Sequence, residues 1–260
     1  MSSVVAACGG DDKDTSVAAS SATTSPTASP TSSPAATASS GSPAASPSPS
    51  AAEGAGGTPI AYCVEQAQQD AGGVTFKRAY GVDVPGLILG TGERGIVLSN
   101  MAGDDLCSWL AYAPELAGAG SRVALFNYSG TENHEDVIAA AAMLRERGAT
   151  KVVLMGASAG GTTVVQAGAK LSPPPAAVVS LSPQDSTDGR TSAKSLTAPT
   201  LYVSAEMDAG NVDATKALHA ATAGKDKILK IVPDAAHGTA LLLSDPLKAE
   251  IYAFIDTRTK

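Results

Sequence analysis

The sequence predicts a three-layer α/β/α domain, in which helices cover both faces of a mostly parallel sheet of about eight strands. Two observations lead to this fold class. From residue 95 onwards, short and almost continuously apolar runs alternate with helix-like segments, which is typical of parallel strands that are buried on both faces. Before residue 95, two strand-like runs (74–80 and 84–89) have no helix between them, which indicates an antiparallel hairpin at the edge of the sheet.

The remaining elements follow in a regular order. Apolar runs rich in Val, Ile and Leu predict the strands after the hairpin, at residues 95–100, 121–127, 150–155, 176–181, 200–204 and 227–232. Segments of helix-forming residues, several of which stop at glycine, predict the helices, at residues 109–116, 135–147, 162–171, 212–223 and 247–255. The connections between these elements are short, so no large lid domain is expected.

The first 57 residues differ in composition from the rest of the chain. They are dominated by Ser, Thr, Ala, Pro and Gly, and no aromatic residue precedes Tyr62. Such a segment buries too little apolar surface to offset the entropy that is lost on ordering it. We therefore expect a disordered linker over residues 1–57 and one folded domain over residues 58–260.

Charge and hydropathy exclude several kinds of partner. The net charge is −7 at pH 7 and no run of Lys or Arg occurs, so binding to nucleic acid or to an anionic lipid surface is not expected. The longest apolar run of the domain, residues 137–144, is too short to cross a bilayer. The sequence has no phosphate-binding loop, dinucleotide fingerprint or metal-ligand pattern, so no cofactor is expected. A monomer is the default expectation.

A candidate nucleophile is Ser158, at the centre of Gly156-Ala-Ser-Ala-Gly160. The pattern G-x-S-x-G arises easily by chance in a chain rich in Gly and Ser, so it needs its structural context. Here a predicted strand precedes it and a predicted helix follows it. In that context the glycines permit a sharp turn that holds the serine hydroxyl at the carboxyl edge of the sheet. The alternative is a glycine-rich turn with an unreactive serine.

A serine hydroxyl needs a neighbouring base to become a good nucleophile, and the sequence has three histidines. His134 lies near the start of a predicted helix and His219 lies within another, so both are expected at the surface. His237 follows the last predicted strand, and its loop can return over the sheet edge where Ser158 lies. His237 is therefore the predicted base, the alternative being a histidine in contact with solvent only.

The acid that would hold the histidine ring is predicted at Asp208, shortly after the strand 200–204. A carboxylate there can bond the second ring nitrogen and stabilise the imidazolium. Glu206 and Asp185 also follow predicted strands and remain alternatives. The predicted order along the chain is then Ser158, Asp208 and His237.

From about residue 84 to residue 260 the sequence resembles the α/β-hydrolase superfamily, which has the same chain order of Ser, acid and His. The resemblance is to its small, lidless dienelactone-hydrolase-like and carboxylesterase-like members. It rests on residues 156–160, 205–208 and 235–238, and on Ile96-Val-Leu-Ser-Asn-Met101 with Trp109 and residues 112–116 behind it. It implies a serine hydrolase that cleaves a small carboxylic ester through an acyl-enzyme. A peptidase or thioesterase with the same triad, and a non-catalytic surface-binding protein, remain alternatives.

The resemblance also implies backbone donors for the oxyanion that forms on the substrate. The first parallel strand of the family usually ends in His-Gly, and Ser99-Asn100-Met101 occupies that place here. Carried over to this sequence, the donors are the N–H groups of Met101 and Ala159. The side chains expected to line the substrate pocket are Asn100, Trp109, Tyr112 and Tyr128.

The three cysteines fit an exported protein. Val5-Ala-Ala-Cys8 resembles the lipobox of bacterial lipoproteins, which implies a lipid on Cys8 and a surface-anchored protein that contacts the membrane through this anchor alone. The alternative is a chance match in an alanine-rich segment. In an oxidising compartment Cys63 and Cys107 would be left to pair, and we expect a disulfide bond between them rather than two buried thiols.

Overall fold

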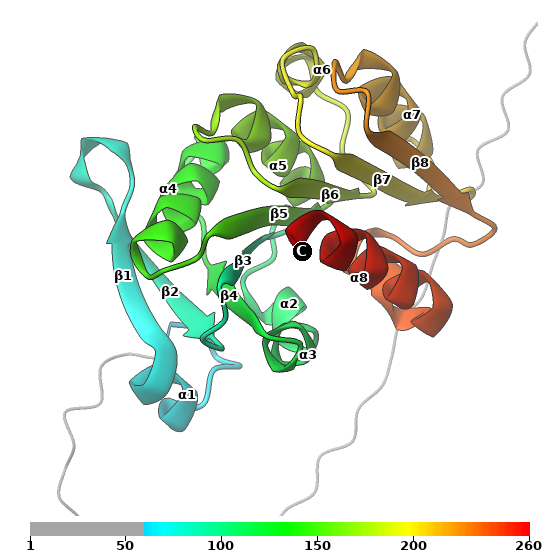
Figure 1. The fold of residues 1–260 in the computed structure, drawn as a ribbon. Helices are drawn as coiled ribbons and strands as arrows, with labels where there is room; N and C mark the ends of the chain where they lie inside the picture. Colours follow the sequence, from blue (N-terminus) through cyan, green and yellow to red (C-terminus); the bar gives the residue numbers. More distant parts are fainter. Residues whose placement is uncertain (1–59) are drawn as a thin grey trace, which may run out of the picture. The chain divides into compact units, whose positions relative to one another are not determined.

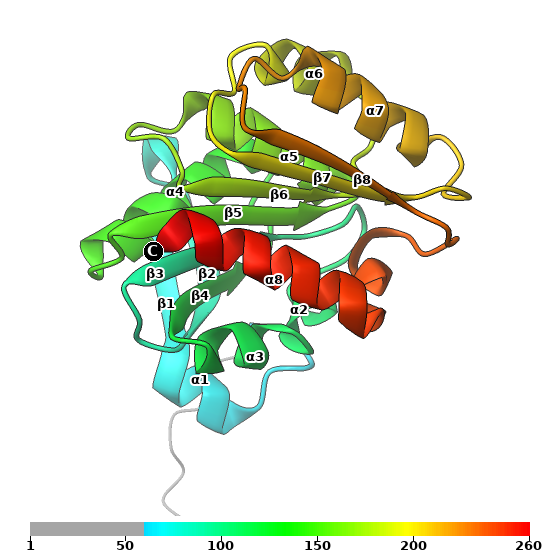
Figure 2. The same ribbon diagram turned by 45° about the vertical axis from the view of Figure 1, so that its right-hand side comes forward.

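The computed structural model describes residues 60–260. Cys8 and the linker predicted over residues 1–57 therefore lie outside the described residues. The described part is built on one eight-stranded sheet, which Figure 1 and Figure 2 show from two directions. The strands are β1 (Gly73–Lys77), β2 (Asp83–Leu89), β3 (Arg94–Ser99), β4 (Ser121–Phe126), β5 (Lys151–Ala157), β6 (Ala177–Leu181), β7 (Thr200–Ala205) and β8 (Lys227–Val232).

The strands are arranged in the order β1-β2-β4-β3-β5-β6-β7-β8. β1 pairs with β2, and β2 with β4, in antiparallel orientation. All further pairs, from β4–β3 to β7–β8, are parallel. The predicted, mostly parallel sheet with an antiparallel hairpin at its edge is therefore confirmed. Because β3 to β8 run in the same direction, the residues that follow them meet at one edge of the sheet.

Helices cover both faces of this sheet, so the three-layer prediction is confirmed (Figure 1, Figure 2). One layer consists of α4 (Asn133–Glu146), α5 (Ala159–Lys170), α6 (Thr187–Ala193) and α7 (Asn211–Ala221). The other consists of α1 (Gln66–Gly72), α2 (Cys107–Leu110), α3 (Ala113–Gly118) and α8 (Asp245–Thr259). Two apolar cores separate the layers, and neighbouring residues of a central strand point into different cores, Val153 into one and Leu154 into the other.

The α-helices differ from the sequence prediction at three places, and two 3-10 helices, η1 (Ala79–Gly81) and η2 (Gly238–Leu243), were not predicted. The helix expected over residues 109–116 is two short helices, because Pro114 has no N–H to bond the carbonyl group one turn earlier. Two short α-helices, α1 and α6, were not predicted. α1 begins where Glu65 N–H donates to Gln68 Oε1, and α6 begins where Ser186 Oγ accepts a hydrogen bond from Gly189 N–H. The connection from β6 to β7 carries only α6, and the described residues include no large lid domain.

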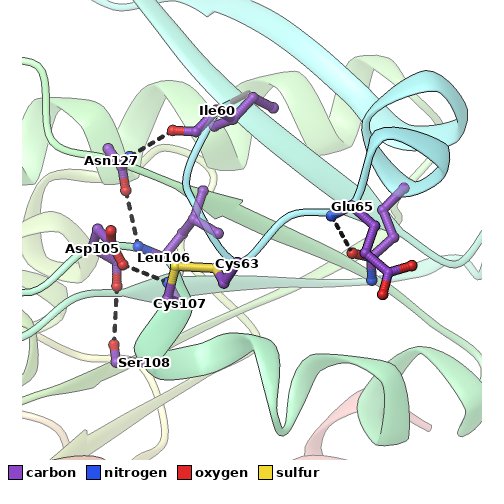
Figure 3. The surroundings of a disulfide bond; sticks show 9 residues. Ile60, Cys63, Glu65, Asp105, Leu106, Cys107, Ser108 and Asn127 are labelled. Atoms are coloured by element: carbon purple, nitrogen blue, oxygen red, sulfur yellow. Dashed lines mark hydrogen bonds between the residues drawn. A yellow bond between two sulfur atoms is a disulfide. The ribbon is translucent and has the colours of Figure 1, made fainter. Parts of the chain in front are cut away.

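A disulfide bond joins Cys63 to Cys107, as predicted (Figure 3). It fastens the segment before α1 to the start of α2. The side chain of Asn127 strengthens this attachment: it donates a hydrogen bond to Ile60 O at 3.2 Å and accepts one from Leu106 N–H at 2.9 Å. The segment between β3 and α2 is therefore held firmly at its α2 end.

Candidate active site

Ser158 alone makes the turn between β5 and α5. β5 ends at Ala157 and α5 begins at Ala159. Ser158 has a φ of 53° and a ψ of −120°, a conformation that is rare for residues other than glycine and costs about 1–3 kcal/mol. Its N–H donates a hydrogen bond to Leu181 O at the end of β6, at 2.8 Å. This is the sharp strand–turn–helix geometry that the sequence motif predicts.

Close backbone contacts require the glycines on either side of this turn. A Cβ atom on Gly156 would lie 2.2 Å from Gly160 O, and a Cβ atom on Gly160 would lie 2.2 Å from Ser99 O and 2.5 Å from Asn100 O. A side chain at either position would therefore force neighbouring backbone segments apart, β5 from α5 at Gly156 and α5 from the end of β3 at Gly160. The first turn of α5 packs directly on the segment that follows β3, so the residues expected to donate to an oxyanion lie on adjacent segments.

Asp208 and His237 form a pair at the same edge of the sheet. The two carboxylate oxygens of Asp208 lie 3.0 and 3.1 Å from His237 Nδ1. The Asp208 side chain is 7% exposed, whereas the His237 side chain is 41% exposed. Because a carboxylate only accepts hydrogen bonds, Nδ1 carries the proton of the neutral ring and Nε2 keeps its lone pair. In this tautomer the ring can take a proton from a neighbouring hydroxyl.

The surroundings of Asp208 keep it ionised. Burial would raise the pKa of its carboxyl, but hydrogen bonding from Asn211 and Ser182, together with the bond and charge of His237, lowers the pKa below its usual value. Asn211 Nδ2 donates to Asp208 Oδ1 at 2.8 Å, whereas the Ser182 hydroxyl meets no full hydrogen-bond geometry. Sequence reasoning missed Asn211, although an Asn three residues after an Asp at the start of a helix was the available signal.

The loop after β8 brings His237 back to the turn at Ser158. A Cβ atom on Gly238, the next residue, would lie 3.5 Å from Ala157 Cβ and 2.3 Å from Met101 Sδ. The Met101 side chain therefore fills the corner between this loop and the ends of β3 and β5. Segments far apart in the sequence meet here, as the parallel topology requires.

The other acids and histidines considered from the sequence lie elsewhere. Glu206 is exposed, and the Asp185 carboxylate pairs with Arg190. His134 Nε2 lies 2.6 Å from Lys170 Nζ, and the His219 ring packs edge-on against another aromatic ring of the core. The structure therefore pairs His237 with Asp208 rather than with either rival acid.

Comparisons with known proteins agree on the fold. No family model and no curated protein matches the sequence, but solved structures match the fold. An esterase from Pyrococcus furiosus superposes with a TM-score of 0.63 at 12% identity, over 72% of this chain and 90% of its own. A dienelactone hydrolase from Anabaena variabilis gives 0.59 at 21% identity, over 71% and 94%. An enol-lactonase from Burkholderia xenovorans gives 0.58 at 15% identity, over 70% and 99%. The chain has the α/β-hydrolase fold.

Within this α/β-hydrolase fold, two of the predicted pocket residues are core residues. Asn100 is 1% exposed and Trp109 is 0% exposed. Asn100 Nδ2 donates to Phe126 O at 2.7 Å, and Trp109 Nε1 donates to Ser99 O at 3.1 Å. Both side chains support the segment after β3 from inside the protein. The prediction that they line the substrate pocket conflicts with this burial, because both side chains are turned into the core.

The two predicted pocket tyrosines also differ in position. Tyr112 is partly buried between α2 and α3, near Lys248 of α8, and burial raises the pKa of its hydroxyl. The Tyr128 hydroxyl lies closer to the candidate site, where it bonds to Ser99 Oγ and donates to Asn100 O at 3.2 Å. Tyr128 therefore contacts the expected oxyanion segment itself.

One polar cavity of the described part lies away from the candidate catalytic residues. A polar cavity of about 410 Å³ lies over α5, between α4 and α6, and its lining includes Thr163 but neither Ser158, Asp208 nor His237. Among residues 60–260, no three His, Cys, Asp or Glu side chains are grouped so that they could hold a metal ion.

In the same part of the chain, no helix has both the length and the apolar character needed to cross a membrane.

Proposed function

We propose that this protein is a serine hydrolase that cleaves a carboxylic ester through Ser158, His237 and Asp208. The observation that carries the proposal is the strained backbone of Ser158 at the sheet edge where Asp208 and His237 pair. Strain of this kind persists where the surroundings enforce it, and it is concentrated at functional sites. The names of the structural neighbours, an esterase, a dienelactone hydrolase and an enol-lactonase, support an ester as the substrate class.

The first half of the proposed reaction transfers the acyl group to the enzyme. Ser158 Oγ attacks the ester carbonyl carbon while its proton moves to His237 Nε2, and Asp208 stabilises the imidazolium through Nδ1. The tetrahedral intermediate collapses when its bond to the alcohol oxygen breaks. The proton on Nε2 passes to that oxygen, so the alcohol leaves as a neutral molecule and an acyl-Ser158 ester remains.

The second half releases the acid. Water attacks the acyl-Ser158 carbonyl and gives one proton to His237, which returns it to Ser158 Oγ as the acid departs. In both halves the oxyanion is stabilised by the backbone N–H groups of Met101 and Ala159, a contribution worth about 3–4 kcal/mol for each donor in comparable enzymes. Ala159 is the first residue of α5, so its N–H has no acceptor within the helix.

The test is a comparison of two serine variants. Ser158→Ala should abolish turnover of p-nitrophenyl acetate and butyrate and should abolish labelling by a fluorophosphonate probe. Ser121→Ala is the matched control, because Ser121 is equally buried and begins β4 at the opposite edge of the sheet. It should keep both activities.

The outcomes separate the proposal from its alternatives. Turnover that survives in Ser158→Ala would contradict the proposed nucleophile. If the folded wild-type protein shows neither labelling nor turnover, the result would favour a non-catalytic binding protein with this fold. Labelling without ester turnover would indicate that the substrate is a peptide or a thioester. A panel of these substrates would then identify the bond that is cleaved.

We also propose that the protein is exported and anchored through a lipid on Cys8. The disulfide bond between Cys63 and Cys107 supports an oxidising compartment, because such bonds rarely persist in the cytosol. Mass spectrometry of the full chain from a bacterial membrane fraction should find the lipid on Cys8. An unmodified Cys8 in the exported protein would contradict the anchor.

A further inference from the structure

We propose that Tyr128 is a positioning residue of the oxyanion hole. Its hydroxyl is hydrogen bonded to the end of β3 and to the segment after it, which carries the Met101 amide. The catalytic part of this inference rests on the proposed hydrolase function.

The contacts on the β3 side fix the direction of one peptide group. The Tyr128 hydroxyl donates to Asn100 O at 3.2 Å and is hydrogen bonded to Ser99 Oγ. The peptide group that contains Asn100 C=O also contains Met101 N–H, and it is planar with the two bonds pointing in opposite directions. A hydrogen bond that fixes the carbonyl therefore also fixes the direction in which the Met101 N–H points.

The second proposed donor, the Ala159 amide, is held separately. Thr163 Oγ1 donates to Ala159 O at 2.9 Å, so the first turn of α5 is held by a hydrogen bond of its own. The single proton of the Tyr128 hydroxyl goes to Asn100 O. The positioning role of Tyr128 therefore concerns the Met101 amide.

The Tyr128 ring is held so that its hydroxyl cannot easily move. The ring packs edge-on against Phe126 at a centroid distance of 5.9 Å, and Phe126 packs in the same way against Phe76 at 5.7 Å. Burial raises the pKa of Tyr128 to about 12, so the hydroxyl remains a donor at every pH at which an esterase is assayed. Rigid placement of donors before the reaction is what makes an oxyanion hole effective.

The protein provides a matched control for removal of this hydroxyl. Tyr202 on β7 is 0% exposed, its hydroxyl bonds to Thr222 Oγ1 at 2.6 Å, and burial raises its pKa to about 12 as well. Tyr128 is partly buried, so Tyr202→Phe removes a tyrosine hydroxyl that is at least as buried and that has no contact with the segment after β3. The general loss of stability that follows from removing a tyrosine hydroxyl should be similar in Tyr202→Phe and Tyr128→Phe. An effect on the site itself should appear in Tyr128→Phe only.

The experiment compares kcat, KM and hydrogen exchange in the two variants. Tyr128→Phe should lower kcat for p-nitrophenyl acetate about 10-fold, since one hydrogen bond that acts through the Met101 amide is lost, and should change KM less than about 2-fold. Tyr202→Phe should leave kcat unchanged. Amides in the peptide that covers residues 99–106 should exchange faster in Tyr128→Phe only.

Each arm can overturn the inference. Equal kcat values in the two tyrosine variants would contradict a role in positioning the oxyanion donors, and equal exchange over residues 99–106 would contradict the structural link. Failure of the proposed function looks different, because the wild-type protein itself would then be inactive and Ser158 would not react with the probe. In that case the exchange arm still decides whether Tyr128 fixes the segment.

Discussion

The two segments that bring Ser158 and His237 to one sheet edge are built in different ways. The turn at Ser158 is a single residue, is 3% exposed, and is enclosed by backbone atoms of β3 and α5. The loop that carries His237 is longer, leaves 41% of the imidazole side chain exposed, and packs partly on the flexible side chain of Met101. Closely packed backbone atoms therefore fix Ser158 in place, whereas His237 is held mainly by its hydrogen bonds to Asp208.

This contrast predicts the largest effect for a change in hydrogen bonding at the base. Asp208→Asn keeps the shape of the side chain but presents an N–H that favours the wrong tautomer of His237, so kcat should fall about 10⁴-fold. Stability should change little by comparison. Ester turnover and thermal unfolding measure the two effects, and Glu206→Gln, a change at an exposed neighbouring acid, is the control. A kcat within about 10-fold of the wild-type value in Asp208→Asn would contradict the proposed role.

Two glycine substitutions compare the segments directly. Gly160→Ala places a methyl group 2.2 Å from Ser99 O, a backbone atom that cannot yield, so the free energy of unfolding should fall by more than about 3 kcal/mol. Gly238→Ala meets Met101 Sδ, which can rotate away, and adds strain at a φ of 59°, so the loss should be about 1–2 kcal/mol. Urea unfolding measures both. A greater loss for Gly238→Ala would reverse the comparison.

The segment after β3 is held at both ends, at Asn100 by the hydrogen bond from Tyr128 and at Cys107 by the disulfide bond. The disulfide bond closes a loop with a sequence separation of 44 residues, so replacing both cysteines by alanine should lower stability by about 3–4 kcal/mol. The Ser158 turn does not depend on this bond, so folded protein should still react with a fluorophosphonate. Unfolding curves and probe labelling check the two statements. Complete loss of labelling in the folded variant would show that the turn depends on the disulfide bond.

The smallest predicted effect is the response of stability to acid. Because the pKa of Asp208 is lowered in the folded protein, its stabilising contribution is complete above the unfolded pKa of about 3.9 and is lost as the pH falls through the lower, folded pKa. The free energy of unfolding of the wild-type protein should therefore decrease more steeply below about pH 4 than that of Asp208→Asn. Urea titrations at a series of pH values measure the slopes, and equal slopes would contradict the predicted linkage.

Features that depend on local sequence could be predicted. The strands β3 to β8 lie within two residues of the predicted positions, because strands buried on both faces need continuous apolar runs. The turn at Ser158 could be anticipated because the glycines permit a sharp turn and because a predicted strand and a predicted helix lie directly on either side of it. The Asp208–His237 pair followed from the parallel topology, which brings the ends of β7 and β8 together.

Features that depend on side-chain direction could not be predicted. Trp109 and Asn100 were expected in a pocket, but the rotation of each residue about its element decides whether it faces the core, and the sequence pattern does not reveal that rotation near the end of a strand or in a helix of four residues. The same limit hid the contact of Tyr128 with Asn100. The bond from Asn211 to Asp208 was missed although the spacing of the two residues was visible in the sequence, because the direction of the Asn211 side chain at the start of α7 decides whether it reaches the carboxylate.

The central claim is that Ser158 forms a covalent acyl-enzyme, and trapping this species tests it most directly. The protein is mixed with p-nitrophenyl acetate, quenched in acid within the first turnover, digested and analysed by mass spectrometry. If Ser158 is the nucleophile, one acetyl group should be found on the peptide that contains Ser158, and any acetyl group that forms in His237→Ala should last longer. Ester turnover by the wild-type protein with no acetyl group on Ser158, or with the acetyl group on another residue, would show that Ser158 is not the nucleophile.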